Sequence, residues 1–373
     1  MSGESLAKTK QRIAARDSEL KSALSKLTRE ADFALSGGPY SVTDNQQLAS
    51  GADKHDYSSF GRYWWPDPSG PDGLPYIRRD GKTNPDSQSP KTSDRSRIEL
   101  MSFHVETLGL AYYLTGKEKY AVKAAELLRV WFLDPATRMN PNLNYSQGRP
   151  GHTDGSSSGV LDGRIMVRAF EGSLLIKGSS AFSEAEHAGL KAWAAKYFSW
   201  LQTSELANDA AAKKNNHSTF FDVQAIYFAL YCGDKKAAIK IAEEAAAKRV
   251  LAQISPDGSM PEEMSRTRPF HYGVFNLHSM LMLANLGDRV GVQIWSAGDS
   301  RLSTAVDFFA PYTDPAQSWP GQKIKESDRM KMFPILLMAN EAYPEKNYLQ
   351  FFKNLPSSKS RSLRENLAFP LMR

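Results

Sequence analysis

Residues 213–224 are KKNNHSTFFDVQ, and they place three polar side chains, Asn215, Asn216 and His217, directly before an apolar helical run. Ser218 is the expected N-cap of that helix, because its hydroxyl can accept a hydrogen bond from a free amide of the first turn. Asn216 and His217 would then lie at the positive end of the helix dipole, where anions are favoured. A histidine beside an amide donor suits chemistry on a substrate that carries a carboxylate. The alternative is an ordinary loop of capping residues.

Residues 261–278, PEEMSRTRPFHYGVFNLH, form a second polar stretch that leads into an apolar helix. Arg266 and Arg268 precede the pair His271-Tyr272, which opens the helix. Together the two stretches supply His, Asn, Arg and Tyr. Elimination across a uronic acid needs such groups, because the carboxylate must be bound and a base and an acid must act.

Four motifs in this chain are similar to those of the alginate-lyase superfamily of polysaccharide lyases. They are Asn-Asn-His-Ser, Arg-x-Arg-x-x-His-Tyr, Arg62–Asp67 (RYWWPD) and Met139–Gln147 (MNPNLNYSQ). The resemblance covers roughly residues 40–340. It implies an α/α-toroid that cleaves a 4-linked anionic polyuronate by β-elimination, without a redox or organic cofactor. Alginate is the first expected substrate and glucuronan the next.

The resemblance also implies roles for the residues of the two stretches. Tyr272 would be the acid and a candidate base, and His217 the other candidate base. Asn216 and an arginine would stabilise the charge that develops at the uronate carboxylate. A free tyrosine has a pKa of about 10, so a nearby cation such as Arg266 would be needed to lower it.

One position departs from the family pattern. Alginate lyases have an arginine seven positions before the tyrosine, and this chain has Ser265 there. The sequence therefore leaves open whether Arg266 or Arg268 binds the carboxylate. It also leaves open which uronate is preferred and whether cleavage is endo or exo.

Two loop-like segments supply further candidates for substrate binding. Residues 36–90 are rich in Gly, Pro, Asp and Ser, and we expect a packed loop over the mouth of a cleft. Trp64 and Trp65 could stack on a sugar ring or anchor this loop. Residues 139–159 are polar and could bind glycan hydroxyls or satisfy their own turns. The expected substrate-binding residues are Arg62, Tyr63, Trp64, Trp65, Tyr145, Gln147, Asn215, Arg268 and His271.

Apolar periodicity predicts helices over most of the remaining chain. The expected helices are 5–35, 97–114 (ending at Gly116), 119–133, 161–176, 183–201, 218–231, 235–254, 272–286, 301–309, 329–342 and 348–355. Pro334 predicts a kink or a late start in its helix. Short strands are possible at 293–295 and in the early loop. The prediction is an all-α chain forming a single domain, residues 1–373.

Composition limits the classes of partner. The net charge is +6 and the pI about 9.1, which favours an anionic polymer. Nucleic acid is not expected, because Lys and Arg are scattered and no reader motif is present. No apolar stretch is long enough for a membrane span. Cys232 is the sole cysteine, so no disulfide forms within the chain. We expect a monomer that is periplasmic or secreted, its signal peptide absent from this sequence.

Two rival functions fit less of the sequence. A glycoside hydrolase on an α/α-barrel needs two carboxylic acids flanking the bond; Glu262 and Glu263 are adjacent and diverge, so Asp154 or Asp162 would have to pair with one of them. A non-catalytic protein that binds acidic glycans is the other alternative. A metal site is not expected, because His271 and His278 lack further ligands at metal-binding spacing.

Overall fold

A computed structural model describes residues 3–322, 324 and 328–368. Within these residues the chain forms two compact units. Unit 1 contains Met1–Glu30, Lys214–Val223 and Lys236–Arg373, and unit 2 contains Ala31–Lys213 and Gln224–Lys235. Because the chain passes between the units four times, the single domain stays a prediction. No helix in the described residues is long and apolar enough to cross a membrane.

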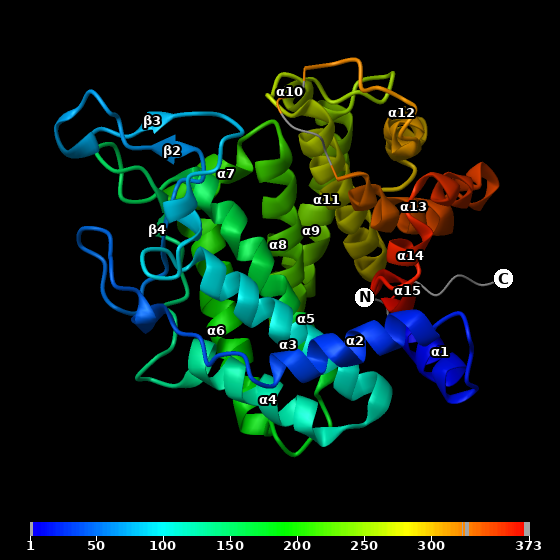
Figure 1. Ribbon diagram of the computed structural model, residues 1–373, viewed down its shortest axis with the longest axis horizontal. Helices are drawn as coiled ribbons and strands as arrows, with labels where there is room; N and C mark the ends of the chain where they lie inside the picture. Colours follow the sequence, from blue (N-terminus) through cyan, green and yellow to red (C-terminus); the bar gives the residue numbers. More distant parts are fainter. Residues whose placement is uncertain (1–2, 323, 325–327, 369–373) are drawn as a thin grey trace. The chain divides into compact units, whose positions relative to one another are not determined.

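Unit 2 is built on closely packed helices (Figure 1). Its helical segments are α3 (Arg95–Thr115), α4 (Glu118–Leu128) with a π-helical extension (Arg129–Leu133), a 3-10 segment (Ser157–Ile165), α5 (Met166–Leu175), α6 (Glu184–Thr203) and α7 (Glu205–Ala211). Helices α3 and α5 approach so closely that a Cβ added to Gly109 would lie 2.6 Å from the carbonyl oxygen of Gly172. The backbones of these two helices therefore need glycine where they cross.

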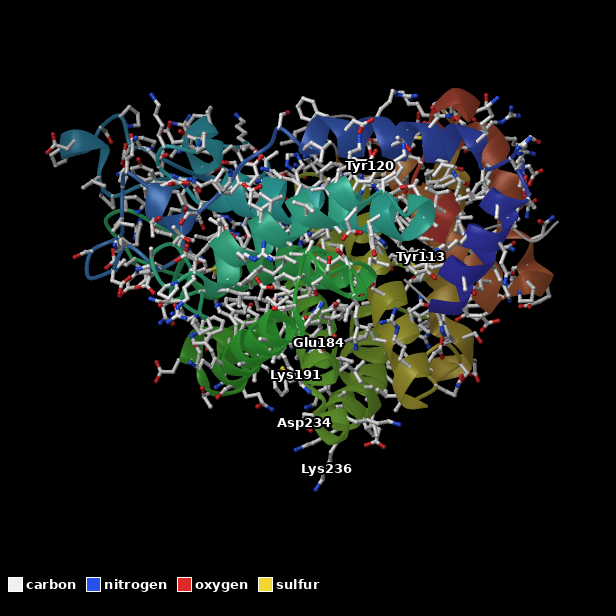
Figure 2. The ribbon with its side chains drawn as sticks, turned by 90° about the horizontal axis from the view of Figure 1, so that it is seen from below. Tyr113, Tyr120, Glu184, Lys191, Asp234 and Lys236 are labelled. Carbon is white, nitrogen blue, oxygen red and sulfur yellow. The ribbon has the colours of Figure 1, made fainter. Side chains whose placement is uncertain are left out.

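Capping residues fix helix ends in unit 2, and the predicted end at Gly116 is confirmed. Gly116 ends α3 in the left-handed conformation, with φ of 68°. Ser183 caps α6 and forms a capping box with Glu186. Tyr120 of α4, labelled in Figure 2, donates to Asp32 in α2 (Lys21–Ala34) with an O–O distance of 2.9 Å.

Unit 1 holds most of the C-terminal helices. They are α9 (Lys235–Ala245) with a π-helical extension (Ala246–Leu251), α10 (Pro261–Met264), α11 (Pro269–Val290), α12 (Ala297–Phe309), α13 (Met332–Ala342), α14 (Ser357–Ser360) and α15 (Glu365–Ala368). Helix α1 (Gly3–Ala14) joins them, since Thr9 Oγ1 donates to the carbonyl of Leu367 at 2.8 Å. Helix α8 (Asn216–Cys232) has residues in both units.

Four short strands organise the loops of unit 2. Strand β1 (Ser58–Phe60) pairs in parallel with β4 (Tyr145–Gly148). This pairing joins the early loop, residues 36–90, to the polar loop of residues 139–159. Strand β2 (Trp64–Trp65) pairs antiparallel with β3 (Ile77–Arg78), as Figure 1 shows. The early segment is therefore packed, as its aromatic content predicts.

Several predicted boundaries were wrong. The first helix is two helices, α1 and α2, because the chain turns at Arg16 with φ of 59°. Residues 293–295 form no strand. Helices α7 and α10 are too short to show an apolar period and were not expected. The late start predicted from Pro334 is confirmed, because α13 begins at Met332.

Candidate active site

Asn216 is the first residue of α8, and its two amide groups face Glu263 of α10. The backbone N–H of Asn216 donates to Glu263 Oε1 at 2.7 Å, and Nδ2 lies 2.9 and 3.1 Å from the two carboxylate oxygens. Asn216 is 2% exposed and Glu263 is 0% exposed. Glu263 therefore caps α8 from a distant part of the sequence, with its carboxylate at the positive end of the helix dipole.

This geometry leaves Asn216 with a donor for a ligand. The two N–H bonds of an amide diverge by about 120°, whereas the two oxygens of one carboxylate lie close together as seen from Nδ2. One N–H of Asn216 therefore serves both oxygens of Glu263. The second N–H points away from the carboxylate and can bind a substrate group.

The predicted N-cap at Ser218 is wrong, because α8 begins two residues earlier. Glu263 takes the capping role that the local sequence assigns to Ser218. The Ser218 hydroxyl instead donates to the carbonyl of Asn215 at 3.0 Å and accepts from Gln253 Nε2 at 3.0 Å. Asn215 Oδ1 accepts from the backbone N–H of His217 at 3.2 Å. Asn215 thus helps to fix the helix start, and His217 is half-buried in the first turn.

Arg266 and Tyr272 are in direct contact. The guanidinium carbon of Arg266 lies 3.8 Å from the centre of the Tyr272 ring, and Tyr272 is 6% exposed. A cation held against the ring favours negative charge that develops on the phenol. The contact favours Arg266 over Arg268 as the functional arginine. Arg268 stands at the N-cap of α11, and its buried Nε makes no hydrogen bond to any described residue.

Glu263 interacts electrostatically with Arg266. Burial raises the pKa of Glu263, while its hydrogen bonds from Asn216 and the charge of Arg266 oppose the rise. Asn216, Glu263, Arg266 and Tyr272 thus form one connected polar corner of unit 1. Sequence reasoning missed the part of Glu263. The sequence analysis considered Glu263 only as a hydrolytic acid. Its position three residues before Arg266 was a signal that the two side chains could lie close together.

His271 directly precedes Tyr272 in the sequence, and its ring packs against two aromatic rings. It meets the Tyr272 ring edge-on at 5.1 Å and stacks on Phe275 at 6.4 Å. Lys331 Nζ lies 3.3 Å from His271 Nδ1. Because an ammonium group only donates, Nδ1 accepts in this contact. Lys331 is a second cation that sequence reasoning missed, since it stands 60 residues away.

The predicted tryptophans of unit 2 anchor their loop. Trp65 Nε1 donates to the carbonyl of Lys82 at 2.9 Å, and Trp64 meets His152 at 5.1 Å. Both tryptophans are half-buried. Arg62 is exposed beside them and donates to Gln88 Oε1 at 3.2 Å. Tyr63, which is half-buried, accepts at its carbonyl from Arg79 N at 2.7 Å.

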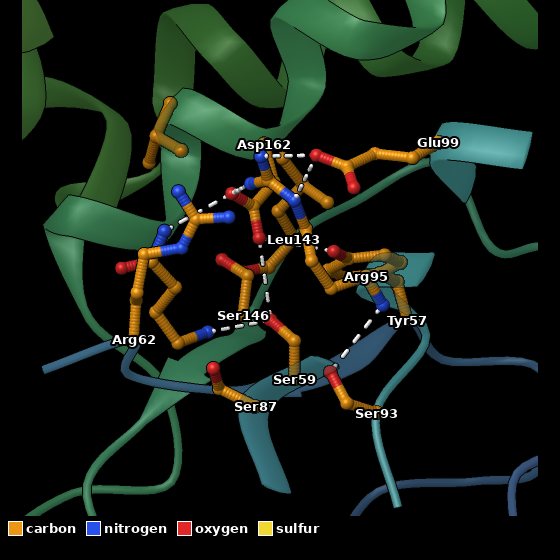
Figure 3. Close-up of polar contacts among 12 residues, drawn as sticks. Tyr57, Ser59, Arg62, Ser87, Ser93, Arg95, Glu99, Leu143, Ser146 and Asp162 are labelled. Atoms are coloured by element: carbon orange, nitrogen blue, oxygen red, sulfur yellow. Dashed lines mark hydrogen bonds and ion pairs between the residues drawn. The ribbon is translucent and has the colours of Figure 1, made fainter. Parts of the chain in front are cut away.

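Gln147 is held by a buried carboxylate, Asp162, which Figure 3 shows among its partners. Gln147 Nε2 donates to Asp162 Oδ1 at 3.0 Å, and its backbone has φ of 47°, unusual for a residue other than glycine. Asp162 also accepts from Tyr57 Oη at 2.9 Å and from the guanidinium of Arg95. Since Nε2 serves Asp162, the amide presents Oε1, an acceptor suited to a sugar hydroxyl. Tyr145 is a loop anchor, because its hydroxyl donates to the carbonyl of Gly51 at 2.9 Å.

Asp162 and Glu263 do not fit the role of a hydrolytic acid. A hydrolytic acid must reach the glycosidic oxygen, yet Asp162 and Glu263 are each 0% exposed and already bound. Glu262 and Asp154, the other two candidates, are exposed and belong to different units. Within residues 3–322, 324 and 328–368, no group of three or more His, Cys, Asp or Glu could hold a metal ion.

The chain matches known proteins in sequence and in structure. Residues 41–319 match the family model described as alginate lyase. A solved alginate lyase from Bacteroides ovatus is 40% identical, with a TM-score of 0.94, and the match covers 100% of this chain and 98% of that one. Among curated proteins, none matches the chain.

A more distant structure shares the fold. Alginate lyase A1-III from Sphingomonas species A1 is 17% identical, with a TM-score of 0.57, and the match covers 93% of this chain and 95% of that one. The helical architecture and these neighbours confirm the predicted all-α toroid class. They also confirm the resemblance on which that prediction rested.

Proposed function

Because the chain belongs to the alginate lyase family, and is therefore a polysaccharide lyase, we propose that it cleaves alginate by β-elimination. Glucuronan is the next candidate substrate. The observation that carries the proposal is the contact between Arg266 and Tyr272, at 3.8 Å, beside an Asn216 amide that Glu263 holds in place. Donors and a phenol gathered in this way suit a reaction that builds negative charge at a carboxylate.

In the proposed reaction the C5–H bond and the C4–O4 bond of one uronate break, and a C4=C5 double bond forms. The base removes the C5 proton, and the acid gives a proton to the leaving O4. Asn216 and Arg266 stabilise the charge that spreads onto the carboxylate. Tyr272 is the acid. The base is Tyr272 or His217, according to the face of the sugar that carries the C5 proton.

The test is a panel of polymannuronate, polyguluronate, glucuronan and a neutral glucan, incubated with the wild type and with Tyr272→Phe. The double bond is conjugated with the carboxylate, so its ultraviolet absorbance reports elimination alone. We expect absorbance to rise on one polyuronate with the wild type and to stay flat with Tyr272→Phe. Near-wild-type turnover by Tyr272→Phe would remove the central residue from the proposal.

Two other outcomes would point to the rival functions. Release of reducing ends without absorbance would indicate hydrolysis, and the acidic residues would then need a new assignment. Binding of a polyuronate without any product would indicate a non-catalytic glycan-binding protein. His217→Ala serves as the second variant: a severe loss supports a catalytic histidine, and retained turnover of alginate assigns His217 to structure.

A further inference from the structure

Arginine side chains of unit 2 gather on the two tryptophans of the early loop. The guanidinium of Arg149 lies 4.9 Å from the centre of the Trp64 ring, and that of Arg79 lies 5.5 Å from the Trp65 ring. The pairing of β2 with β3 sets Arg78 opposite Trp64. Indole rings attract guanidinium groups, so the tryptophans hold these cations in fixed positions.

Backbone hydrogen bonds fix the segment that carries Arg149. Gly61 N donates to the carbonyl of Gly148 at 2.8 Å, and Tyr76 N donates to that of Pro150 at 2.9 Å. Arg149 N itself donates to the carbonyl of Thr153 at 2.7 Å. The backbone of Arg149 is therefore held by hydrogen bonds of its loop, independently of the side chain that lies on Trp64.

Lys213 adds a further positive charge at the segment that contacts this loop, since Ser156 Oγ, two residues before Ser158, donates at 3.0 Å to the carbonyl of Gln147, two residues before Arg149. Lys213 follows α7, and its Nζ donates to Ser158 Oγ at 3.2 Å. Burial and the nearby charge of Arg149 lower the pKa of Lys213 to about 8, while Asp209 opposes this. Burial and the charge of Arg78 lower the pKa of Arg149. Each cation is thus partly removed from water and placed near another cation.

Two buried arginines of unit 2 have carboxylate partners, whereas Arg149 and Lys213 have none in the part of the chain that the structure describes. Arg95 forms an ion pair with Asp162, and Arg97 forms one with Asp94 at 2.7 Å. Within the described residues, neither Arg149 nor Lys213 has a carboxylate within ion-pair distance. Two neighbouring cations without a counter-charge repel each other, and an anionic ligand bound between them would relieve that repulsion.

We propose that Arg149 and Lys213 form a binding site on unit 2 for a carboxylate of the polyuronate chain, with Trp64 holding Arg149 in place. A uronate carboxylate fits this site, because a guanidinium can bind it with two parallel hydrogen bonds and the ammonium adds a point charge. The identity of the ligand as a polyuronate rests on the proposed function. The ligand's negative charge would replace the counter-charge that the protein lacks.

The test measures binding of oligomannuronate by calorimetry, with the full chain carrying Tyr272→Phe so that the ligand stays intact. Lys213→Gln is added in one variant and Lys196→Gln in the control, since Lys196 is an exposed lysine of α6 in the same unit. We expect Lys213→Gln to weaken binding about tenfold, the loss of one charge-assisted hydrogen bond. Lys196→Gln should stay within twofold of the parent. Carboxyl-reduced oligomannuronate should bind equally weakly to all three proteins.

A stability measurement separates binding from folding. Lys213→Gln removes a partly buried positive charge that lies close to Arg149, so its melting temperature should equal or exceed that of the parent. Lys213→Arg, which keeps the charge, should recover most of the affinity. Equal affinities of Lys213→Gln and Lys196→Gln for oligomannuronate would overturn the site, as would a fall in melting temperature that alone accounts for weaker binding.

The two proposals can fail separately. If the wild type yields no double bond from any polyuronate, yet Lys213→Gln binds oligomannuronate more weakly than Lys196→Gln, only the proposed reaction fails. If elimination occurs and the two variants bind equally, only the carboxylate site fails. Absence of any binding of oligomannuronate refutes the site as well as the substrate.

Discussion

Each unit holds an amide side chain with a fully buried carboxylate. Glu263 holds Asn216 in unit 1, at 2.9 and 3.1 Å, and Asp162 holds Gln147 in unit 2, at 3.0 Å. The carboxylates differ in how their charge is balanced. Asp162 forms an ion pair with Arg95, whereas Glu263 forms none with a described residue. Asp162 is therefore part of an ion pair that belongs to the fold, while the charge of Glu263 depends on the donors of the proposed active site.

The largest expected effect is on stability and concerns the paired carboxylate. Asp162→Asn leaves the buried guanidinium of Arg95 with Glu99 as its remaining partner. We expect the free energy of unfolding to fall by about 3 kcal/mol, because the buried guanidinium loses its buried carboxylate partner and keeps only the more exposed Glu99. Thermal and denaturant unfolding measure the loss. Asp154→Asn, at an exposed position, should be neutral, and an equal effect of the two substitutions would show that Asp162 is no structural anion.

The next effect is on catalysis and concerns the unpaired carboxylate. Glu263→Gln keeps an acceptor for the α8 backbone but no longer orients the Asn216 amide by charge. We expect kcat to fall about 100-fold with little change in KM, because misplaced groups lose catalysis more than binding. Stability should fall by about 1 kcal/mol at most, the value of one hydrogen bond. The matched control, Glu262→Gln, alters an exposed neighbour, and a similar loss of kcat there would remove the positioning role from Glu263.

The contrast explains how much could be predicted from sequence. Periodicity located most helices, and the order of the motifs placed Asn216 and Tyr272 in an alginate lyase. Neither signal reveals the partner of an amide, because Glu263 lies 47 residues from Asn216 in the chain. The N-cap at Ser218 was wrong for the same reason, since propensity rules see only neighbours in sequence.

The sequence predicted that the long loops are packed, but it did not predict which segments pair with each other. Their aromatic residues indicated order, whereas the pairing of Ser58 with Tyr145 depends on segments that are far apart in sequence. Asp162 lies 15 residues from Gln147 and was weighed only as a hydrolytic acid. Sequence patterns show which residue types are present, while burial decides whether a carboxylate acts as an acid or as a structural anion.

A smaller effect should follow from changing the amide instead of its carboxylate. Gln147→Leu removes the acceptor that Asp162 aims outward, but leaves the ion pair with Arg95 intact. We expect KM for the polyuronate to rise about fivefold with kcat nearly unchanged, the value of one neutral hydrogen bond to a sugar hydroxyl. Steady-state kinetics provide the test, with the exposed Gln202→Leu of α6 as the control. An unchanged KM would show that Gln147 shapes its loop and binds no sugar.

The smallest effect is on the pH dependence of stability. Burial raises the pKa of Glu263 above its ordinary value of 4.5, so the folded state holds this proton more tightly than the unfolded state does. The folded state is thus favoured most below pH 4.5, and that advantage is lost as the pH rises through the folded-state pKa. As the pH rises through this interval, the melting temperature of the wild type should fall relative to that of Glu263→Gln, which has no carboxyl group to ionise at this position. The two curves of melting temperature against pH should therefore converge or cross. Parallel curves would mean that Glu263 keeps one charge state throughout, and the distinction between the two carboxylates would then rest on catalysis alone.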